Sequence, residues 1–271
     1  MKKITALLLA LMMLAGVLAG CGKPQDTGKA GKLKVVTTIF PAYDWVRAIL
    51  GDKADNAEVT MLLDNGVDLH SYQPTADDIV RISDCDLFVY VGGESDGWVE
   101  NALQNAQVLC VTLADALCAI DPDNKNTYIA NAAAYRDKLA ALDADYKAAV
   151  DGATHKTVLF GDRFPFRYLV DDYGLRYYAG LAGCSAETEA SFETVSFLAK
   201  KVDELGLPCV LTIEGAQHRI AETIVQNTAG KNQRVLTMDS MQSTTSKDVA
   251  NGATCLSVME KNLSVLKGAL G

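Results

Sequence analysis

The chain has 271 residues, 49% of them hydrophobic, and a formal net charge of −9 at pH 7. That length is enough for two modest lobes, each with a core of its own. The acidic balance argues against a nucleic-acid partner, because phosphate backbones select basic surfaces.

The N-terminus has the features of an export signal. Two lysines precede an apolar run (residues 4–18) that is shorter than the roughly 20 residues a membrane span requires. The segment Leu18-Ala19-Gly20-Cys21 is typical of a lipobox, in which the cysteine is acylated and becomes the mature N-terminus. We expect a lipoprotein signal peptide over 1–20, a lipidated tether over 21–32 with Cys21 as the lipidation site, and an extracytoplasmic protein anchored to the bacterial membrane. An ordinary secretory signal is the alternative.

The next segment, 33–120, alternates apolar runs with helical patterns. Strands are expected at Leu33–Ile39, Ala57–Leu63, Leu87–Val91 and Gln107–Thr112, and helices at Ala42–Leu50, Ala76–Ile82 and Gly97–Asn105. This β-α-β alternation predicts an N-terminal lobe built on a parallel sheet covered by helices.

A long amphipathic helix is expected next, within a linker over 121–152. From Thr127 the apolar positions step by three and four residues, and the pattern ends near Gly152.

The remaining segment, 153–271, again reads as α/β. Strands are expected at Thr157–Phe160, Tyr177–Leu181, Cys209–Ile213 and Val235–Met238, and helices at Phe164–Tyr173, Phe192–Leu205, Gln217–Thr228 and Val249–Leu270. The predicted fold is α/β, with two parallel-sheet lobes joined by one long rigid helix and a ligand cleft between the lobes.

Polar side chains recur just past the carboxyl ends of the predicted strands. His70 follows the second strand of the first lobe, and Asp162 and Asp239 follow two strands of the second. Ligands of open α/β sheets bind at such ends, and imidazole and carboxylate are donors for divalent metals. Local roles compete with ligation, since Asp162 can pair with Arg163 and Asp239 can cap the turn that follows it.

Several segments together resemble a known family, the metal-binding lipoproteins of bacterial ABC importers, which form the zinc and manganese group (cluster A-I) of solute-binding proteins. The segments that carry the resemblance are Val35–Pro41, Gly66–Thr75, Asp86–Gly93 and Leu236–Ser240. The resemblance implies a cation held between two lobes by about four side chains. It also implies the ligand positions: His70 is the first, Asp162 is the nearest donor to the third, which is usually His or Glu, and Asp239 is the fourth.

The second ligand that the resemblance implies has no counterpart. In the family it is a histidine of a His-x-Trp segment before the long helix, but no histidine lies between His70 and His155. Either the chain is a shortened variant with an altered site, or the sequence carries a deletion. Water, Glu214 or His218 can fill the gap; as loop residues, the last two can also be merely solvated.

The functional expectation follows from the resemblance. The chain, expected to be a monomer, would capture a divalent metal and deliver it to an ABC permease. An oxygen-rich ligand set favours Mn²⁺, and zinc stays ahead because the overall resemblance is closest to zinc-uptake proteins. The alternative is a degenerate member that acts as a surface adhesion or interaction protein. We expect no enzyme, since the sequence has no His-Glu-x-x-His helix.

Overall fold

The computed structural model describes residues 31–64, 66, 72–90, 102–181, 190–215 and 218–271. The chain divides into two units, and the second, Leu33–Gly271, is the folded body. The predicted signal peptide and Cys21 lie outside the described residues. Within the described ranges, no helix has both the length and the apolar character needed to cross a bilayer.

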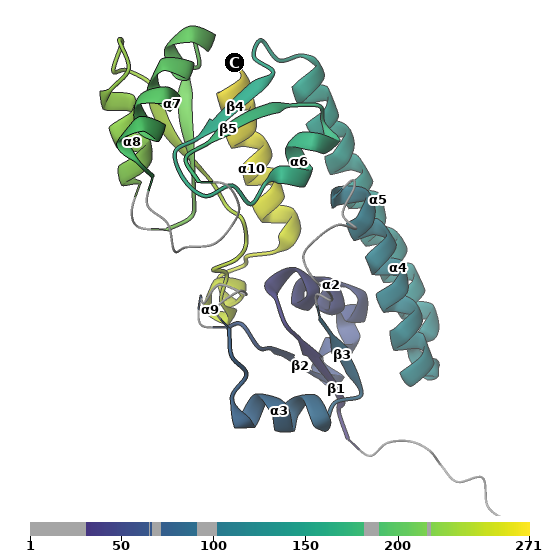
Figure 1. The fold of residues 1–271 in the computed structure, drawn as a ribbon. Coiled ribbons are helices and arrows are strands. Elements are labelled where there is room, and N and C mark those ends of the chain that lie inside the picture. Colours follow the sequence, from purple (N-terminus) through teal and green to yellow (C-terminus); the bar gives the residue numbers. More distant parts are fainter. Residues whose placement is uncertain (1–30, 65, 67–71, 91–101, 182–189, 216–217) are drawn as a thin grey trace, which may run out of the picture. The chain divides into compact units, whose positions relative to one another are not determined.

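The first sheet has three parallel strands in the order β2-β1-β3 (Figure 1). The strands are β1 (Leu33–Thr37), β2 (Ala57–Met61) and β3 (Leu87–Val89), and the connecting helices are α2 (Phe40–Leu50), the 3-10 helix η1 (Gly51–Asn56) and α3 (Ala76–Ser83). The predicted β-α-β order is therefore confirmed over this part of the chain.

The prediction of a fourth strand in this lobe is wrong. Residues 107–112 lie inside a helix, α4 (Ala102–Ile120). The buried side chains of α4 recur at helical spacing: Ala106, Cys110, Leu113, Ala114 and Leu117. A short apolar run does not distinguish a strand from a buried helix, and here packing on the next helix decides. Of the predicted helix Gly97–Asn105, residues 102–105 belong to α4 and the rest lies outside the described residues.

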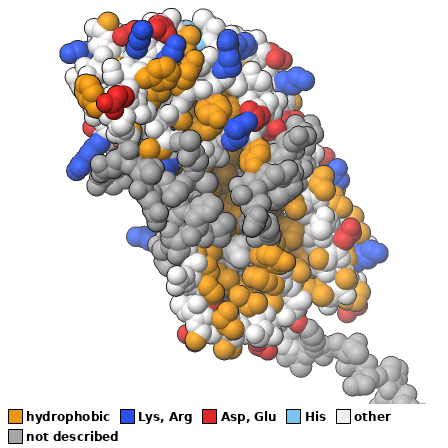
Figure 2. Space-filling view, in the orientation of Figure 1, with side chains coloured by type: hydrophobic (Ala, Val, Ile, Leu, Met, Phe, Trp, Pro, Cys, Tyr) orange, Lys and Arg blue, Asp and Glu red, His pale blue; other side chains and the backbone are white. Residues whose placement is uncertain are grey.

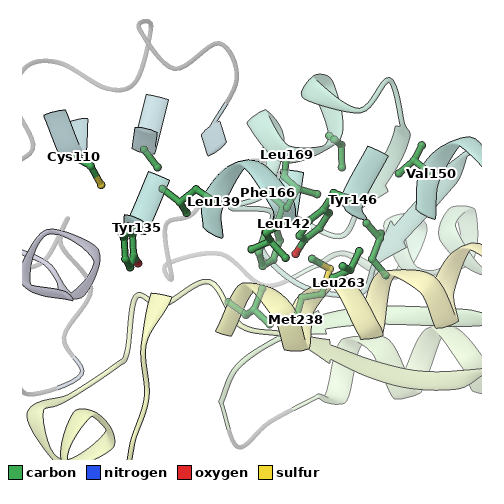
Figure 3. Close-up of a cluster of buried hydrophobic side chains, with 14 of the residues drawn as sticks. Cys110, Tyr135, Leu139, Leu142, Tyr146, Val150, Phe166, Leu169, Met238 and Leu263 are labelled. Atoms are coloured by element: carbon green, nitrogen blue, oxygen red, sulfur yellow. The ribbon is translucent and has the colours of Figure 1, made fainter. Parts of the chain in front are cut away.

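The predicted long helix is confirmed. After a 3-10 turn, η3 (Pro122–Asn124), α5 (Lys125–Asp151) runs for 27 residues, about 40 Å at 1.5 Å per residue. One face is buried along its whole length through Tyr128, Ala132, Tyr135, Leu139, Leu142, Tyr146 and Val150. Figure 3 shows Leu142 and Tyr146 close to Phe166, Leu169 and Leu263, which belong to the same hydrophobic core.

The second sheet has four parallel strands in the order β5-β4-β6-β7. They are β4 (Thr157–Phe160), β5 (Arg176–Ala179), β6 (Cys209–Ile213) and β7 (Arg234–Met238). The helices are α6 (Arg167–Asp172), α7 (Phe192–Leu205), α8 (Arg219–Gln226), α9 (Ser246–Ala250) and α10 (Cys255–Leu270). All four strands lie where the sequence predicts them.

The predicted helix Val249–Leu270 is in fact two helices, α9 and α10. Gly252 has a φ of 94°, which a glycine adopts without the steric penalty of a side chain. Capping boxes at Thr245 and Thr254 begin α9 and α10 separately. The helical spacing of apolar residues does not reveal this break, because it continues on both sides of Gly252.

A buried carboxylate connects three helices from distant parts of the chain. Asp44 of α2 is 8% exposed, and its Oδ2 accepts hydrogen bonds from the Tyr135 hydroxyl of α5 at 3.1 Å and from the Cys255 backbone N–H of α10 at 2.9 Å. The first helix of the N-terminal sheet, the long helix and the C-terminal helix therefore meet at one side chain.

Two helices of the N-terminal part of the chain, α3 and α4, carry exposed apolar side chains. None of the α3 side chains is buried, and Ile79, Val80, Val108 and Val111 of α3 and α4 are among the exposed large apolar residues. Figure 2 shows apolar side chains gathered over the region of the N-terminal sheet. The described residues of α3 and α4 thus leave part of their apolar surface exposed.

Candidate metal centre

The topology of the second sheet marks one location for a ligand. The chain leaves β4 towards β5 on one side and then crosses to β6 on the other, so its connections diverge between β4 and β6. In open parallel sheets ligands bind outside the carboxyl ends of the strands at such a switch point.

Asp162 lies at this point, directly after β4. Its Oδ1 accepts the backbone N–H of Arg163 at 2.7 Å, and its Oδ2 accepts the hydroxyl of Thr212 at 2.8 Å. The preceding Gly161 lies against α8, where a Cβ would stand 2.4 Å from the Ala221 Cα. The loop that carries Asp162 is therefore fixed between two strands and a helix.

His218 reaches the same point from the other strand. It precedes α8 and is half-buried, and its Nδ1 lies 3.1 Å from the Thr212 Oγ1. One buried hydroxyl, of a residue that is 0% exposed, therefore connects the Asp162 carboxylate with the His218 imidazole.

A second acidic pair lies along the same edge, at the ends of β6 and β7. Glu214 accepts hydrogen bonds from the Ser240 backbone N–H at 2.7 Å and from the Ser240 hydroxyl at 2.5 Å. Asp239 Oδ1 accepts the Met241 backbone N–H at 2.7 Å, so the turn-capping role considered for Asp239 is present in the structure.

The backbone of Asp239 is held by a buried amide from α10. Asn262 is 1% exposed; its Oδ1 accepts the Asp239 N–H and its Nδ2 donates to the Asp239 carbonyl, both at 2.8 Å. Burial raises the pKa of Asp239, the Met241 N–H opposes that rise, and the charge of nearby Glu214 adds to it. A cation at this edge would favour the ionised form.

The described donors form two pairs rather than a closed site. Asp162 and Asp239 follow β4 and β7, which flank β6, so their backbones are two strand spacings apart, roughly 10 Å. Among the described residues, no three His, Cys, Asp or Glu side chains gather closely enough to hold a metal. The structure thus brings Asp162 to His218 and Asp239 to Glu214, and leaves a gap between the pairs.

The predicted first ligand, His70, lies outside the described residues. A residue shortly before it contacts the start of α9: the Ser246 backbone N–H donates to Asp64 Oδ1. A Cβ on Gly66 would lie 3.8 Å from the Ser243 carbonyl oxygen. The chain that leads to His70 therefore lies beside the loop after β7, which begins with Asp239.

Thr212 and Asn262, which hydrogen-bond to Asp162 and Asp239, were not predicted from the sequence. Thr212 lies inside the apolar run of β6, and Asn262 lies on the apolar face of α10. A polar residue on a face that is otherwise buried was the available signal, because such a group needs a partner. The sequence does not give the identity of that partner.

The comparisons with known proteins agree on one family. The family model described as zinc-uptake complex component A, periplasmic (ZnuA) matches residues 35–112 and 101–269. The zinc-binding lipoprotein AdcA of Streptococcus pneumoniae serotype 4 is 30% identical over 98% of this chain and 61% of its own length. The high-affinity zinc uptake system protein ZnuA of Bacillus subtilis is 25% identical over 94% of each chain.

Solved structures have the same fold. The Zn(II)-bound ZnuA-like domain of Streptococcus pneumoniae AdcA has a TM-score of 0.73 at 29% identity, covering 89% of this chain and 99% of that one. The metal-dependent lipoprotein YcdH of Bacillus subtilis has a TM-score of 0.74 at 26% identity, covering 88% and 99%. The fold expected from the sequence, α/β with two parallel sheets, is therefore confirmed.

The relatives are longer than this chain. It spans 61% of the length of Streptococcus pneumoniae AdcA, and their alignment runs over 316 positions, more than the 271 residues available here. The family model matches in two pieces that overlap at 101–112, within α4. Part of the relatives thus has no counterpart in this chain. Over residues 35–269, on a fold shared with zinc-bound relatives, this chain belongs to the ZnuA family of zinc-uptake components.

Proposed function

We propose that this chain captures a divalent metal ion outside the cytoplasm and delivers it to an ABC permease. The observation that carries the proposal is the edge of the second sheet in a chain of the ZnuA family, where two pairs of possible donors, Asp162 with His218 and Glu214 with Asp239, lie at strand ends. That family supplies the binding component of an uptake system and is not a family of enzymes, in agreement with the expectation from the sequence.

His70, Asp162 and Asp239 are the proposed protein ligands. Asp162 and Asp239 flank the end of β6, and the chain that leads to His70 contacts the loop after β7. Burial, with a further contribution from the charge of Glu214, raises the pKa of Asp239, and a metal held between the ligands would favour its ionised form. The remaining positions of a four-ligand site would come from water, Glu214 or His218.

Zinc is the proposed cargo, with manganese second. The relatives named above are zinc-binding or zinc-uptake proteins. The carboxylates among the proposed ligands would also accept the harder Mn²⁺.

The proposed location is outside the cytoplasm, with the chain anchored by lipid to the bacterial cell membrane. Cleavage after residue 20 and acylation of Cys21 would attach the folded unit Leu33–Gly271 through the tether 21–32. The partner would be the permease of a metal importer, and the chain would act as a monomer.

The test is calorimetric titration of the chain from residue 22 onward, which contains the whole compact unit. We expect stoichiometric Zn²⁺ binding that is tighter than Mn²⁺ binding and is lost in Asp239→Ala. Asp115→Ala, which removes an exposed acid of α4, is the matched control and should bind as the unaltered chain does. Absence of binding to both metals would refute the proposal.

A second candidate is a role in surface adhesion or interaction that needs no metal, and the absent segment around residues 101–112 favours it. The discriminating variant is His70→Ala. If cells that carry His70→Ala fail to grow in zinc-poor medium, the biological role depends on metal, and the adhesion role is excluded.

A further inference from the structure

The hydroxyl of Thr212 determines which atoms donate and which accept in the hydrogen bonds that join Asp162, Thr212 and His218. It is buried, it lies 2.8 Å from Asp162 Oδ2 and 3.1 Å from His218 Nδ1, and it has a single proton to donate. A carboxylate only accepts, so the Thr212 proton goes to Asp162. The Thr212 oxygen then has lone pairs left, and His218 Nδ1 is the atom that donates to them.

This assignment has a direct consequence for the histidine. A neutral imidazole has one N–H, so with the proton on Nδ1 the lone pair of His218 is on Nε2. Metal-binding histidines show this arrangement, in which one ring nitrogen donates to a protein oxygen and the other binds the ion.

The surroundings of His218 hold the ring in place. It precedes α8, whose Ala221 and Ile224 are 0% exposed, and Gly161 allows α8 to approach the end of β4 closely. The ring therefore sits at the divergence point of the sheet, on packed elements. The other described histidine, His155, lies elsewhere, with its backbone N–H donating to the carbonyl of Leu270.

We propose that His218 Nε2 is a ligand of the captured zinc ion and supplies the imidazole that the absent second-ligand segment no longer provides, with Thr212 as its positioning residue. The inference rests on the proposed function. On this proposal Asp162 and His218 are neighbouring ligands on one side of the site, Asp162 binding through a carboxylate oxygen and His218 through Nε2. It accounts for a zinc site in a chain that lacks one of the expected histidines.

The first measurement needs no metal. Nitrogen NMR of the ¹⁵N-histidine-labelled chain from residue 22 onward, with the His218 signals identified by their loss in His218→Gln, reports which ring nitrogen is protonated. We expect the Nδ1–H form at neutral pH and a shift of the Nε2 signal when Zn²⁺ is added. A His218 protonated at Nε2, or an Nε2 signal that does not respond to bound zinc, would overturn the proposal.

The second measurement is the zinc dissociation constant of matched variants. His218→Gln should weaken binding by more than the about 10- to 100-fold that loss of a second-shell partner causes, whereas His155→Gln should leave it unchanged. Thr212→Val should weaken binding by about 10- to 100-fold and shift the tautomer, and Thr212→Ser should restore both. Circular dichroism would verify that each variant folds.

The outcomes separate the two proposals. If the unaltered chain binds zinc and His218→Gln binds it equally well, the role of His218 is refuted and the proposed function stands. If the unaltered chain binds no zinc, the role of His218 is refuted, and if it binds no manganese either, so is the proposed function.

Discussion

The buried carboxylate of Asp44 allows a sharp test of how the helices are held together. In Asp44→Ala the Tyr135 hydroxyl and the Cys255 backbone N–H both lose their acceptor. An unsatisfied buried donor costs about 1–3 kcal/mol. Water in the cavity of about 550 Å³ that Asp44 and Tyr135 line can serve the tyrosine in part, so we expect a loss of about 2–4 kcal/mol in the free energy of unfolding.

Asp44→Asn is the matched variant. Both hydrogen bonds end on one oxygen, Oδ2, and an amide oxygen can accept them in the same place. The substitution removes the charge without removing the acceptor. We therefore expect Asp44→Asn to be as stable as the unaltered chain at neutral pH, or more stable, when both are unfolded in urea.

The pH dependence has a defined sign. Burial raises the pKa of Asp44 above its ordinary value of 3.8, against the opposing effect of its hydrogen bonds from Cys255 and Tyr135. A raised folded-state pKa means that ionisation opposes folding. The unaltered chain should therefore gain stability relative to Asp44→Asn as the pH falls from the folded-state pKa towards 3.8, and the difference should vanish below it. An Asp44→Asn variant as unstable as Asp44→Ala would refute the reasoning, because it would show that the charge itself holds the helices.

Three further outcomes follow from the structure. Asn262→Ala removes both hydrogen bonds that hold the Asp239 backbone. Zinc affinity measured by calorimetry should therefore fall, although Asn262 is not itself a proposed ligand. Unchanged affinity would mean that the turn at Asp239 keeps its conformation without Asn262. Gly161→Ala places a Cβ 2.4 Å from the Ala221 Cα, so thermal unfolding should show a loss of about 1–3 kcal/mol from overpacking, and a neutral substitution would contradict the close approach. Zinc at 100 times its dissociation constant should stabilise the chain by about 2.7 kcal/mol, reversed by chelator; an unfolding midpoint that zinc does not move would count against a folded-state site.

The region around α4 matters for the candidate metal site and also carries exposed apolar side chains. The break between the two family matches lies at 101–112, in α4, and exposed apolar residues of α4 include Val108 and Val111. The resemblance implies a second histidine ligand before the long helix α5, and the two family matches overlap in the helix that precedes α5.

Elements with a single dominant local signal were predictable. The long helix α5 follows from one apolar stripe over 27 residues, and β4, β6 and α7 have the predicted bounds. The errors arose where two structures share one local pattern. The run 107–112 is apolar enough for a strand, and the break at Gly252 lies between two segments with the same helical period.

The candidate site was predictable only in part. Parallel strands end at one edge of a sheet, so Asp162 and Asp239 were predictable as neighbours of the switch region. That Thr212 connects Asp162 to His218, and that Asn262 holds Asp239, depends on residues 50, 6 and 23 positions apart in the chain. No local pattern encodes such contacts.

The sequence by itself determined the fold class, the strand order along the chain, the acidic character and the family resemblance, because these depend on periodicity, composition and short motifs. The tertiary structure decided which polar side chains meet: the Asp162–Thr212–His218 connection, the Glu214–Ser240 contact and the three-helix junction at Asp44. The physical reason is that a buried polar group must find a hydrogen-bond partner, and the packing of distant elements decides which one it meets.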